Sequence, residues 1–426
     1  MSELSYLEKL MDGVEVEWLP LSKVFNLRNG YTPSKTKKEF WANGDIPWFR
    51  MDDIRENGRI LGSSLQKISS CAVKGGKLFP ENSILISTSA TIGEHALITV
   101  PHLANQRFTC LALKESYADC FDIKFLFYYC FSLAEWCRKN TTMSSFASVD
   151  MDGFKKFLIP RPCPDNPEKS LAIQSEIVRI LDKFSELTAE LTAELTAELN
   201  MRKKQYNYYR DQLLRFKEGE VEWKTLGEIG DFTYGYAAKA MDSGDARFVR
   251  ITDINKDGKL SKENPMYVEL NEENEKYTLD KNDLLMARTG ATFGKTMIFE
   301  EDYPAVYAGF LIKLNLNKTI INAKYYWHFA QSDFFWEQAN KLVSGGGQPQ
   351  FNANALKQVR VPIPYPSHPQ KSLDEQGRIV DILDKFDAIT ASITEGLPRE
   401  IELRQKQYEY YRDLLLSFPK PETVSK

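Results

Sequence analysis

The chain contains one long internal repeat, and this repeat limits the architectures that the sequence can adopt. Residues 177–216 align without a gap on residues 379–418, and 23 of the 40 aligned positions are identical. Shorter matches keep the same order, because 15–18 matches 220–223 and 48–54 matches 248–254. Two near-identical segments therefore alternate with two diverged domains. A chain of this kind can present two different surfaces to one asymmetric, bipartite ligand along a pseudo-two-fold axis.

The first copy of the repeat is predicted to lie in a helix from about Ile173 to Lys217. It contains three tandem Thr-Ala-Glu-Leu units at 188–199, and all of these residues except Thr are good helix formers. The leucines recur every four residues rather than every 3.6, so the apolar stripe drifts by about 40° per unit. A short contact between two helices can absorb this drift.

The second copy keeps the apolar pattern but carries two residues that disfavour helix. Ile389 and Ile393 continue the stripe, whereas Gly396 and Pro398 predict a break or kink. The matching faces of the two helices favour packing against each other. Chain order favours an antiparallel pair with one globular domain at each end.

The diverged domains are predicted to be mixed and rich in strands. Residues 83–87 and 283–287 are candidate buried strands, and the aromatic-rich segments 121–130 and 321–330 are candidate helices whose rings belong to the core. Proline-rich strips at 160–164 and 362–366 predict extended connectors. The fold class is therefore α+β, with two strand-rich domains and two long helices packed as an antiparallel coiled coil. The predicted divisions are 1–13 (a segment completing the distal helical region), 14–164 (first domain), 165–217 (central helix), 218–366 (second domain) and 367–426 (distal helical region and tail).

Composition restricts the class of protein. The sequence contains no run of 18 apolar residues, so no membrane span is expected. The N-terminal residues carry acidic side chains and do not resemble a signal peptide. The six cysteines lack any C-x-x-C pair and indicate reduced, cytoplasmic thiols. The net charge is −4, yet residues 28–77 hold ten Lys and Arg against five Asp and Glu. A local basic face of this kind is compatible with DNA binding.

No motif predicts catalysis with any specificity. The four histidines fit no metal-binding pattern, and neither a G-x-S-x-G elbow nor the methyltransferase Asn/Asp-Pro-Pro-aromatic motif is present. The segment from Gly290 to Thr296 resembles a phosphate loop but has three residues between its glycines instead of four. A nucleotide-dependent or nuclease subunit that uses this loop is one alternative at this point. A coiled-coil scaffold without DNA contact is another.

Three polar segments are candidates for contacts with DNA. Residues 29–38 combine hydroxyls, an amide and lysines, residues 105–107 are Asn-Gln-Arg, and residues 345–352 are rich in Gly and Gln. Such groups suit phosphate oxygens and base edges, since amides pair with adenine and Arg with guanine. A solvated basic loop, a buried polar turn and a flexible loop explain the same patterns equally well.

The motifs in their order along the chain resemble one family. Tyr-Thr-Pro-Ser at 31–34, Trp-Phe-Arg-Met-Asp-Asp-Ile at 48–54, Ala-Thr-Ile-Gly at 90–93, the two Ile-Pro-x-Pro strips and the repeated Q-x-x-I-V-x-I-L-D-K-F helix are similar to the DNA-specificity subunit of type I restriction–modification systems. The Thr-Ala-Glu-Leu units resemble those of the type IC branch. The resemblance covers the whole chain.

The resemblance implies a division of labour between subunits. Each diverged domain would be a target recognition domain for one half of a split sequence in double-stranded DNA. The long helices would set the distance between the half-sites and dock two adenine-methyltransferase subunits. S-adenosylmethionine would then belong to those subunits, and ATP and Mg to the restriction subunits that join them. The chain itself would be a non-catalytic cytoplasmic protein without metal or cofactor.

The resemblance and the polar patterns together nominate two sets of residues. The second domain departs from the turn motif of the first, because it has Tyr234, Tyr236 and Lys239 at the corresponding place. The candidates for DNA binding are Gly30, Thr32, Ser34, Lys35, Lys37, Lys38, Ser89, Thr91, Gln106, Arg107, Tyr234, Tyr236, Lys239, Arg288, Thr292, Lys295, Gln348 and Asn352. The candidates for the spacer and for subunit docking are Leu187, Leu191, Leu195, Leu199, Tyr208, Tyr209, Ile389, Ile393, Tyr410 and Tyr411.

Overall fold

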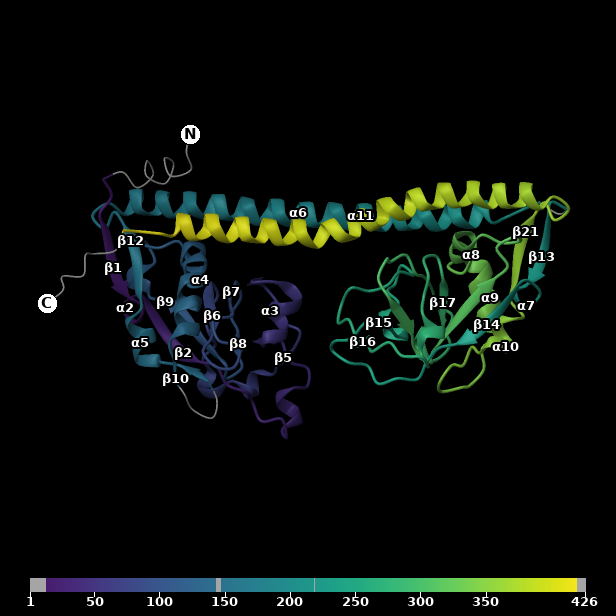
Figure 1. Cartoon of the computed structure of the whole chain (residues 1–426). Coiled ribbons are helices and arrows are strands. Elements are labelled where there is room, and N and C mark those ends of the chain that lie inside the picture. Colours follow the sequence, from purple (N-terminus) through teal and green to yellow (C-terminus); the bar gives the residue numbers. More distant parts are fainter. Residues whose placement is uncertain (1–12, 143–146, 218, 420–426) are drawn as a thin grey trace. The chain divides into compact units, whose positions relative to one another are not determined.

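The computed structural model of the chain describes residues 13–142, 147–217 and 219–419. These residues form two compact units (Figure 1). Unit 1 runs to Thr192 and resumes at Glu400, and unit 2 comprises Ala193–Arg399. Each unit therefore combines one diverged domain with one end of each repeated segment. The predicted N-terminal helical segment 1–13 lies, apart from Gly13, outside the described residues.

The described residues of the unit 1 domain form strands and four α-helices, as expected for an α+β fold. Its main sheet has the order β2-β9-β6-β7-β4, and a smaller sheet has the order β5-β3-β8. The elements are β1 (Val16–Pro20), α2 (Leu21–Val24), β2 (Phe25–Asn29), β3 (Ile46–Phe49), α3 (Met51–Asn57), β4 (Ile60–Leu61), β5 (Lys67–Ile68), β6 (Ser83–Ser87), β7 (His95–Ile98), β8 (Leu103–Ala104), β9 (Phe108–Leu113), α4 (Ile123–Lys139), β10 (Thr141–Thr142), β11 (Ser148–Val149), α5 (Met151–Lys156) and β12 (Leu158–Pro162). The predicted strand at 83–87 is β6, and the predicted aromatic helix becomes α4.

The domain of unit 2 repeats this plan with different sheet sizes. It has a four-stranded sheet of order β14-β20-β17-β18 and a three-stranded sheet of order β16-β15-β19. The elements are β13 (Val221–Thr225), α7 (Leu226–Ile229), β14 (Gly230–Tyr234), β15 (Ala246–Val249), β16 (Tyr267–Val268), β17 (Leu284–Ala287), β18 (Thr296–Ile298), β19 (Ala305–Tyr307), β20 (Leu311–Leu316), α8 (Ala323–Phe329), α9 (Asp333–Leu342), α10 (Ala353–Leu356) and β21 (Arg360–Pro364). The predicted strand at 283–287 is confirmed as β17. The predicted helix at 321–330 is confirmed as α8, and its aromatic residues are buried as predicted.

The proline-rich strips are extended, as predicted, and their first residues belong to paired strands. β12 pairs antiparallel with β1, so that Pro160 lies opposite Trp18, and β21 pairs with β13, so that Pro362 lies opposite Trp223. Proline cannot donate a hydrogen bond and is tolerated on edge strands. Each strip belongs to a two-stranded ribbon, where only one edge of the strand is paired.

The two repeated segments form the long helices α6 (Pro167–Leu213) and α11 (Pro369–Leu415). Each begins with a proline, whose fixed φ and missing N–H suit the first turn of a helix. The sequence predicted a break or kink at Gly396 and Pro398. A break is wrong, because α11 continues through Pro398, and a kink stays a prediction. Proline removes a single hydrogen bond from the helix. We attribute the continuity to the packing of the two ends of α11 in two separate cores.

The ends of α6 and α11 run side by side and antiparallel within each unit, as predicted (Figure 1). In unit 1 the Phe184 ring stacks on Tyr411, with centroids 5.1 Å apart. In unit 2 the repeat counterparts Phe386 and Tyr209 stack at the same distance of 5.1 Å. The repeat in the sequence is therefore also a repeat of side-chain contacts.

A second repeated set of contacts fastens each domain to its helix. Gln174 of α6 accepts a hydrogen bond from the Asp122 backbone N–H at 2.9 Å, and Gln376 of α11 accepts one from Asn322 at 2.8 Å. Asp122 and Asn322 cap α4 and α8, so each glutamine holds the beginning of the neighbouring helix. Unit 1 adds an ion pair between Lys124 and Asp182 at 2.7 Å.

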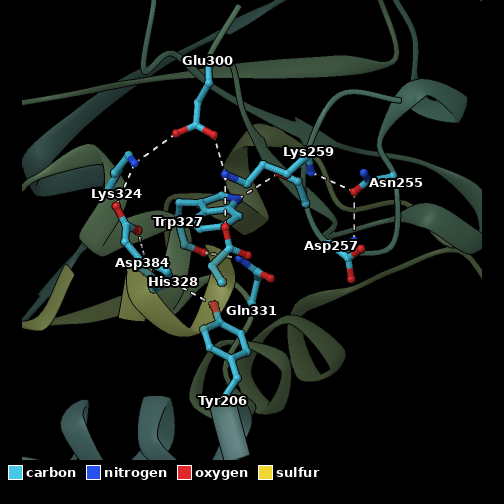
Figure 2. A network of polar contacts seen from close by, with 12 residues as sticks. Tyr206, Asn255, Asp257, Lys259, Glu300, Lys324, Trp327, His328, Gln331 and Asp384 are labelled. Atoms are coloured by element: carbon cyan, nitrogen blue, oxygen red, sulfur yellow. Dashed lines mark hydrogen bonds and ion pairs between the residues drawn. The ribbon is translucent and has the colours of Figure 1, made fainter. Parts of the chain in front are cut away.

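Unit 2 extends this attachment into a larger polar network (Figure 2). Lys324 contacts Asp384 at 2.8 Å and Glu300 at 3.0 Å, and Glu300 also pairs with Lys259. His328 contacts Asp384 through Nε2 at 2.9 Å, and its Nδ1 lies 2.8 Å from the hydroxyl of Tyr206. Burial lowers the pKa of His328, which indicates a neutral ring that donates to Asp384 and accepts from the Tyr206 hydroxyl. Although burial alone raises the pKa of Asp384, hydrogen bonds from His328 and Lys324 lower it to about 2.

Two buried histidines of unit 1 predict a loss of stability in mild acid. Burial, followed by the charge of Arg59, lowers the pKa of His95 to about 3, and burial lowers that of His102 to about 4. The unfolded chain binds protons below about pH 6.5, whereas these folded side chains do not until much lower pH. Stability that is present above pH 6.5 is therefore lost as the pH falls, by about 1.4 kcal/mol per pH unit for each histidine.

Urea unfolding of unit 1, followed by hydrogen exchange of its peptides at pH 7, 6 and 5, measures this slope. A His102→Gln chain is expected to show a smaller slope than the unchanged chain. An identical slope in both chains would contradict the assignment.

Candidate nucleic-acid interface

The structure brings four of the predicted residues of unit 1 into one cleft of about 310 Å³. Gly30 makes this possible, because a Cβ at this position would lie 2.1 Å from the carbonyl oxygen of Asn105. The loop after β2 therefore approaches the turn before β9, and the Thr32 hydroxyl donates to the Gln106 side-chain carbonyl. The cleft is lined by Thr32, Lys35, Trp48, Arg50, Met51, Asp52, Arg55, Asn105, Gln106 and Arg107.

A second cleft of about 510 Å³ adjoins the first, because Lys35, Trp48 and Arg50 line both. It adds Lys38, Trp41, Ala42 and Gln66 to the surface. The two clefts together contain five basic side chains and one acidic side chain, Asp52. The predicted Ser34 and Lys37 are exposed in the same loop. Four of the ten Lys and Arg in residues 28–77 thus line one concave surface together with Arg107, and this surface suits a polyanion.

The predicted Ser89 and Thr91 lie in the turn between β6 and β7. This turn is joined to the first cleft, because the Thr88 backbone N–H donates to the Arg107 carbonyl at 2.9 Å. Ser89 also forms a bridge with Ser148 of β11. The Thr91 hydroxyl is buried and has no hydrogen-bond partner. Contacts of Ser89 and Thr91 with DNA stay predictions.

Unit 2 gathers Tyr234, Arg288 and Asn352 in an arrangement built on aromatic rings. The Arg288 guanidinium lies over Tyr234 at 5.2 Å and over Phe310 at 5.4 Å, and its Nε donates to the Gly309 carbonyl at 3.2 Å. The Tyr234 hydroxyl accepts a hydrogen bond from the Ala353 backbone N–H at 3.1 Å. Asn352 caps α10 by accepting from Ala355 at 3.0 Å. Phe310 is 56% exposed and was not among the predicted residues. Its only signal in the sequence is the Gly-Phe pair in the turn after β19.

The other predicted residues of unit 2 lie outside the named strands and α-helices of the same domain. Gln348 is exposed in the Gly-rich loop before α10, and Lys239 is exposed after β14. The Tyr236 hydroxyl donates to Glu273 at 3.3 Å, and the Thr292 hydroxyl donates to the Thr289 carbonyl at 3.3 Å. Lys295 is half-buried directly before β18.

The loop from Gly290 to Thr296 does not have the geometry of a phosphate loop. Such loops leave backbone N–H groups free and lead into a helix. Here the N–H of Gly290 donates to Pro349 at 2.9 Å and that of Gly294 donates to Ala287 at 2.8 Å. The chain then continues as β18, which pairs antiparallel with β17. The alternative of a nucleotide-dependent subunit using this loop therefore has no structural support.

The long helices expose apolar side chains at equivalent positions of the repeat. Leu187 and Ile389 are 51% and 46% exposed, and Tyr208 and Tyr410 are 61% and 59% exposed. Met201 and Leu403, which sequence reasoning missed, are 50% and 53% exposed. The other predicted docking residues, Leu191, Leu195, Leu199, Ile393, Tyr209 and Tyr411, are partly buried or stack on the neighbouring helix.

Among the described residues no three His, Cys, Asp or Glu side chains are grouped in a way that could hold a metal ion. No helix in the described part of the chain is both long and apolar enough to cross a membrane.

Comparison with known proteins identifies the family. The model of the type I restriction modification DNA specificity domain matches residues 13–201 and again residues 218–403. The EcoprrI specificity subunit of Escherichia coli is 65% identical over 93% of both chains, and the EcoR124I/EcoR124II specificity subunit of the same species is 40% identical over the full length of both. A solved chain from a study of complex assembly and conformational transition of a type I restriction–modification system covers 94% of this chain and 97% of its own, with a TM-score of 0.68 and 14% identity. The chain belongs to the family of type I restriction–modification specificity subunits.

Proposed function

We propose that this subunit reads a bipartite, asymmetric sequence in double-stranded DNA, with one half-site contacted by each unit. The observation that carries this proposal is that one repeated plan bears two chemically different surfaces. Unit 1 has the basic, amide-lined clefts around Lys35 and Gln106. Unit 2 has Arg288 between two exposed aromatic rings. Amide and guanidinium groups pair with base edges, so the two surfaces would select different bases.

The repeat also supports the docking of two copies of one partner, which we propose are adenine-methyltransferase subunits. Unit 1 contains Leu187, Leu403 and Tyr410, and unit 2 contains their counterparts Ile389, Met201 and Tyr208. In each helix the methionine or leucine precedes the tyrosine by seven residues, which places both on one helix face. Exposed apolar groups of this kind mark protein-interaction sites.

Replacing this face in one unit is expected to remove one of the two partners. A chain with Leu403→Ser and Tyr410→Ser should bind one methyltransferase subunit at a concentration where the unchanged chain binds two. Anchors of this type contribute about 2 kcal/mol or more each, which corresponds to at least about thirtyfold in affinity. Native mass spectrometry of the reconstituted complex measures the stoichiometry.

The matched controls are the pair Met201→Ser and Tyr208→Ser, which should give the same result through unit 2, and Glu168→Ser, which should keep both partners. Two bound partners in both double variants would refute the docking surface.

We further propose that catalysis resides in the partners. The methyltransferase subunits would supply S-adenosylmethionine and the adenine chemistry, and restriction subunits would supply ATP- and Mg-dependent cleavage. This subunit would then be non-catalytic and would act in the cytoplasm, where its DNA target is found. Membership of the specificity-subunit family supports this division.

The experiment that tests the proposed function is a genome-wide map of methylated adenines. The chain is co-expressed with its cognate methyltransferase in a host without other adenine methylases, and the control omits the chain. A split motif with a fixed gap, present only together with the chain, is the expected result. Methylation that is unchanged by the chain in an assembled, active complex would overturn the proposal.

A further inference from the structure

Two arginines occupy equivalent places in the two units. Arg50 follows β3 and Arg250 follows β15, and each precedes a helical turn. The backbone N–H of Arg50 donates to Asp53 at 2.7 Å, and that of Arg250 donates to Asp253 at 2.8 Å. Their side chains are about equally exposed, at 33% and 30%. Exposure therefore does not distinguish them, and any difference in role must come from their partners.

The Arg250 guanidinium is bound inside unit 2 through its Nε and Nη2 atoms. Its Nε donates to Asp253 Oδ2 at 3.0 Å, and its Nη2 donates to Asp253 Oδ1 at 3.0 Å and to the Asn264 carbonyl at 3.3 Å. Asp253 is 2% exposed and also accepts from the buried Arg247 at 3.2 Å. Arg250 thus balances a buried carboxylate, which is a structural role.

Arg50 has no such partner, and two local differences explain why. The second oxygen of Asp53 is occupied, because it accepts from the Leu65 backbone N–H at 2.6 Å. The position that corresponds to Arg247 is Pro47, which brings no additional charge. Asp53 is therefore satisfied by backbone donors, and the Arg50 guanidinium is not drawn toward it.

The Arg50 side chain is held in place but keeps unused hydrogen-bonding capacity. Its guanidinium lies 5.9 Å from the centroid of the Trp48 ring. Its Nε is buried without a hydrogen-bond partner, so Nη1 and Nη2 are the donors that could reach a ligand. The nearest carboxylate is Asp52, whose Oδ2 lies 3.7 Å from Nη1 and whose side chain is half exposed. Arg50 lines both clefts of unit 1, at the place where they join.

We propose that Arg50 reads a guanine in the half-site contacted by unit 1, whereas Arg250 is structural. The inference rests on the proposed function and assigns one base contact within it. A planar guanidinium donates two parallel hydrogen bonds to O6 and N7 of guanine, the commonest specific contact in the major groove. Asp52 beside Arg50 would repel a phosphate but not the edge of a base. The exposed Lys35 and Lys38 are better placed to contact phosphates.

Methylation maps of three variant chains test the inference. Arg50→Ala is expected to relax selection at one guanine position of one half-site by about tenfold to a hundredfold, from the 1–3 kcal/mol of a bidentate contact. The other half-site should stay unchanged. Arg50→Lys keeps the charge but lacks the fork of donors, so it should relax the same position. Arg250→Ala, the matched control, should lower the melting temperature of the assembled complex without relaxing any single position.

The outcomes separate this inference from the proposed function. Relaxation at a base other than guanine, or a uniform loss of binding with a weaker dependence on salt, would overturn the guanine contact, the latter because it indicates a phosphate. A split motif that is identical in the unchanged and Arg50 chains would refute the inference and leave the proposed function intact. Absence of any split motif with the unchanged chain would overturn both.

Discussion

Deletion of one Thr-Ala-Glu-Leu unit, residues 192–195, is expected to move methylation to a target whose unread gap is shorter by one or two base pairs. Four helical residues contribute about 6 Å of rise and about 40° of rotation beyond one full turn. The rise is comparable to one or two steps of DNA at about 3.4 Å each. Both half-sites should be unchanged, because the deletion alters no residue of either domain. Adenine methylation at the original target should be lost almost completely.

The methylation map of the deletion chain is the measurement. Its matched control is deletion of Ala193 alone, which turns the following helix by about 100° and should abolish methylation rather than move it. Altered half-sites, or an unaltered gap, would show that the tetrapeptide units do not set the spacing. The boundary between the two units falls at Thr192 and Ala193, within this array.

Trp327→Ala is expected to destabilise unit 2 by about 3–5 kcal/mol and to leave unit 1 almost unchanged. Trp327 is fully buried, its Nε1 donates to the Gly258 carbonyl at 3.0 Å, and Lys259 lies 4.5 Å from its ring centroid (Figure 2). The substitution leaves a cavity, removes one of the two hydrogen bonds that the Gly258 carbonyl accepts, and removes the ring beneath Lys259. The main cores of the two units share no residue, so the effect should remain local.

Hydrogen exchange of peptides from both units, followed at increasing urea, separates local from global unfolding. The control is Trp223→Ala, because Trp223 belongs to the same unit but is 38% exposed. It should cost less than about 1 kcal/mol. Equal loss of protection in both units of the Trp327→Ala chain would show that the units unfold together.

The regular elements were the most predictable part of the fold. The 40-residue repeat predicted both long helices, and the apolar runs at 83–87 and 283–287 predicted β6 and β17. These predictions depend on local composition and on a period that neighbouring residues set. The continuity of α11 through Pro398 was not predictable in this way, since we trace it to packing at the two ends of the helix.

Only some residues of the candidate nucleic-acid interface could be predicted from the sequence. The sequence placed Thr32, Lys35, Gln106 and Arg107 among the candidates, and the structure brings these four into one cleft. It did not distinguish Arg50 from Arg250, because the difference depends on which backbone N–H reaches the neighbouring aspartate. In unit 1 that group belongs to Leu65, twelve residues away from Asp53 and in no recognisable motif. Phe310 was missed for a similar reason, because its exposure depends on the tertiary arrangement around Arg288.

The ribbons β1–β12 and β13–β21 give each domain a common entry and exit. The strand that leads into a domain pairs with the strand that leaves it, so the intervening residues return to their starting point before the next helix begins. In its topology each domain is therefore an insertion whose first and last strands, of five residues each, pair with each other. Recombination between related genes at the codons of these two strands would replace one whole domain. It would exchange one half of the target in a single event and would preserve the helices and their docking surfaces. New specificities can therefore arise by shuffling whole domains, without the gradual repacking that point mutations would require.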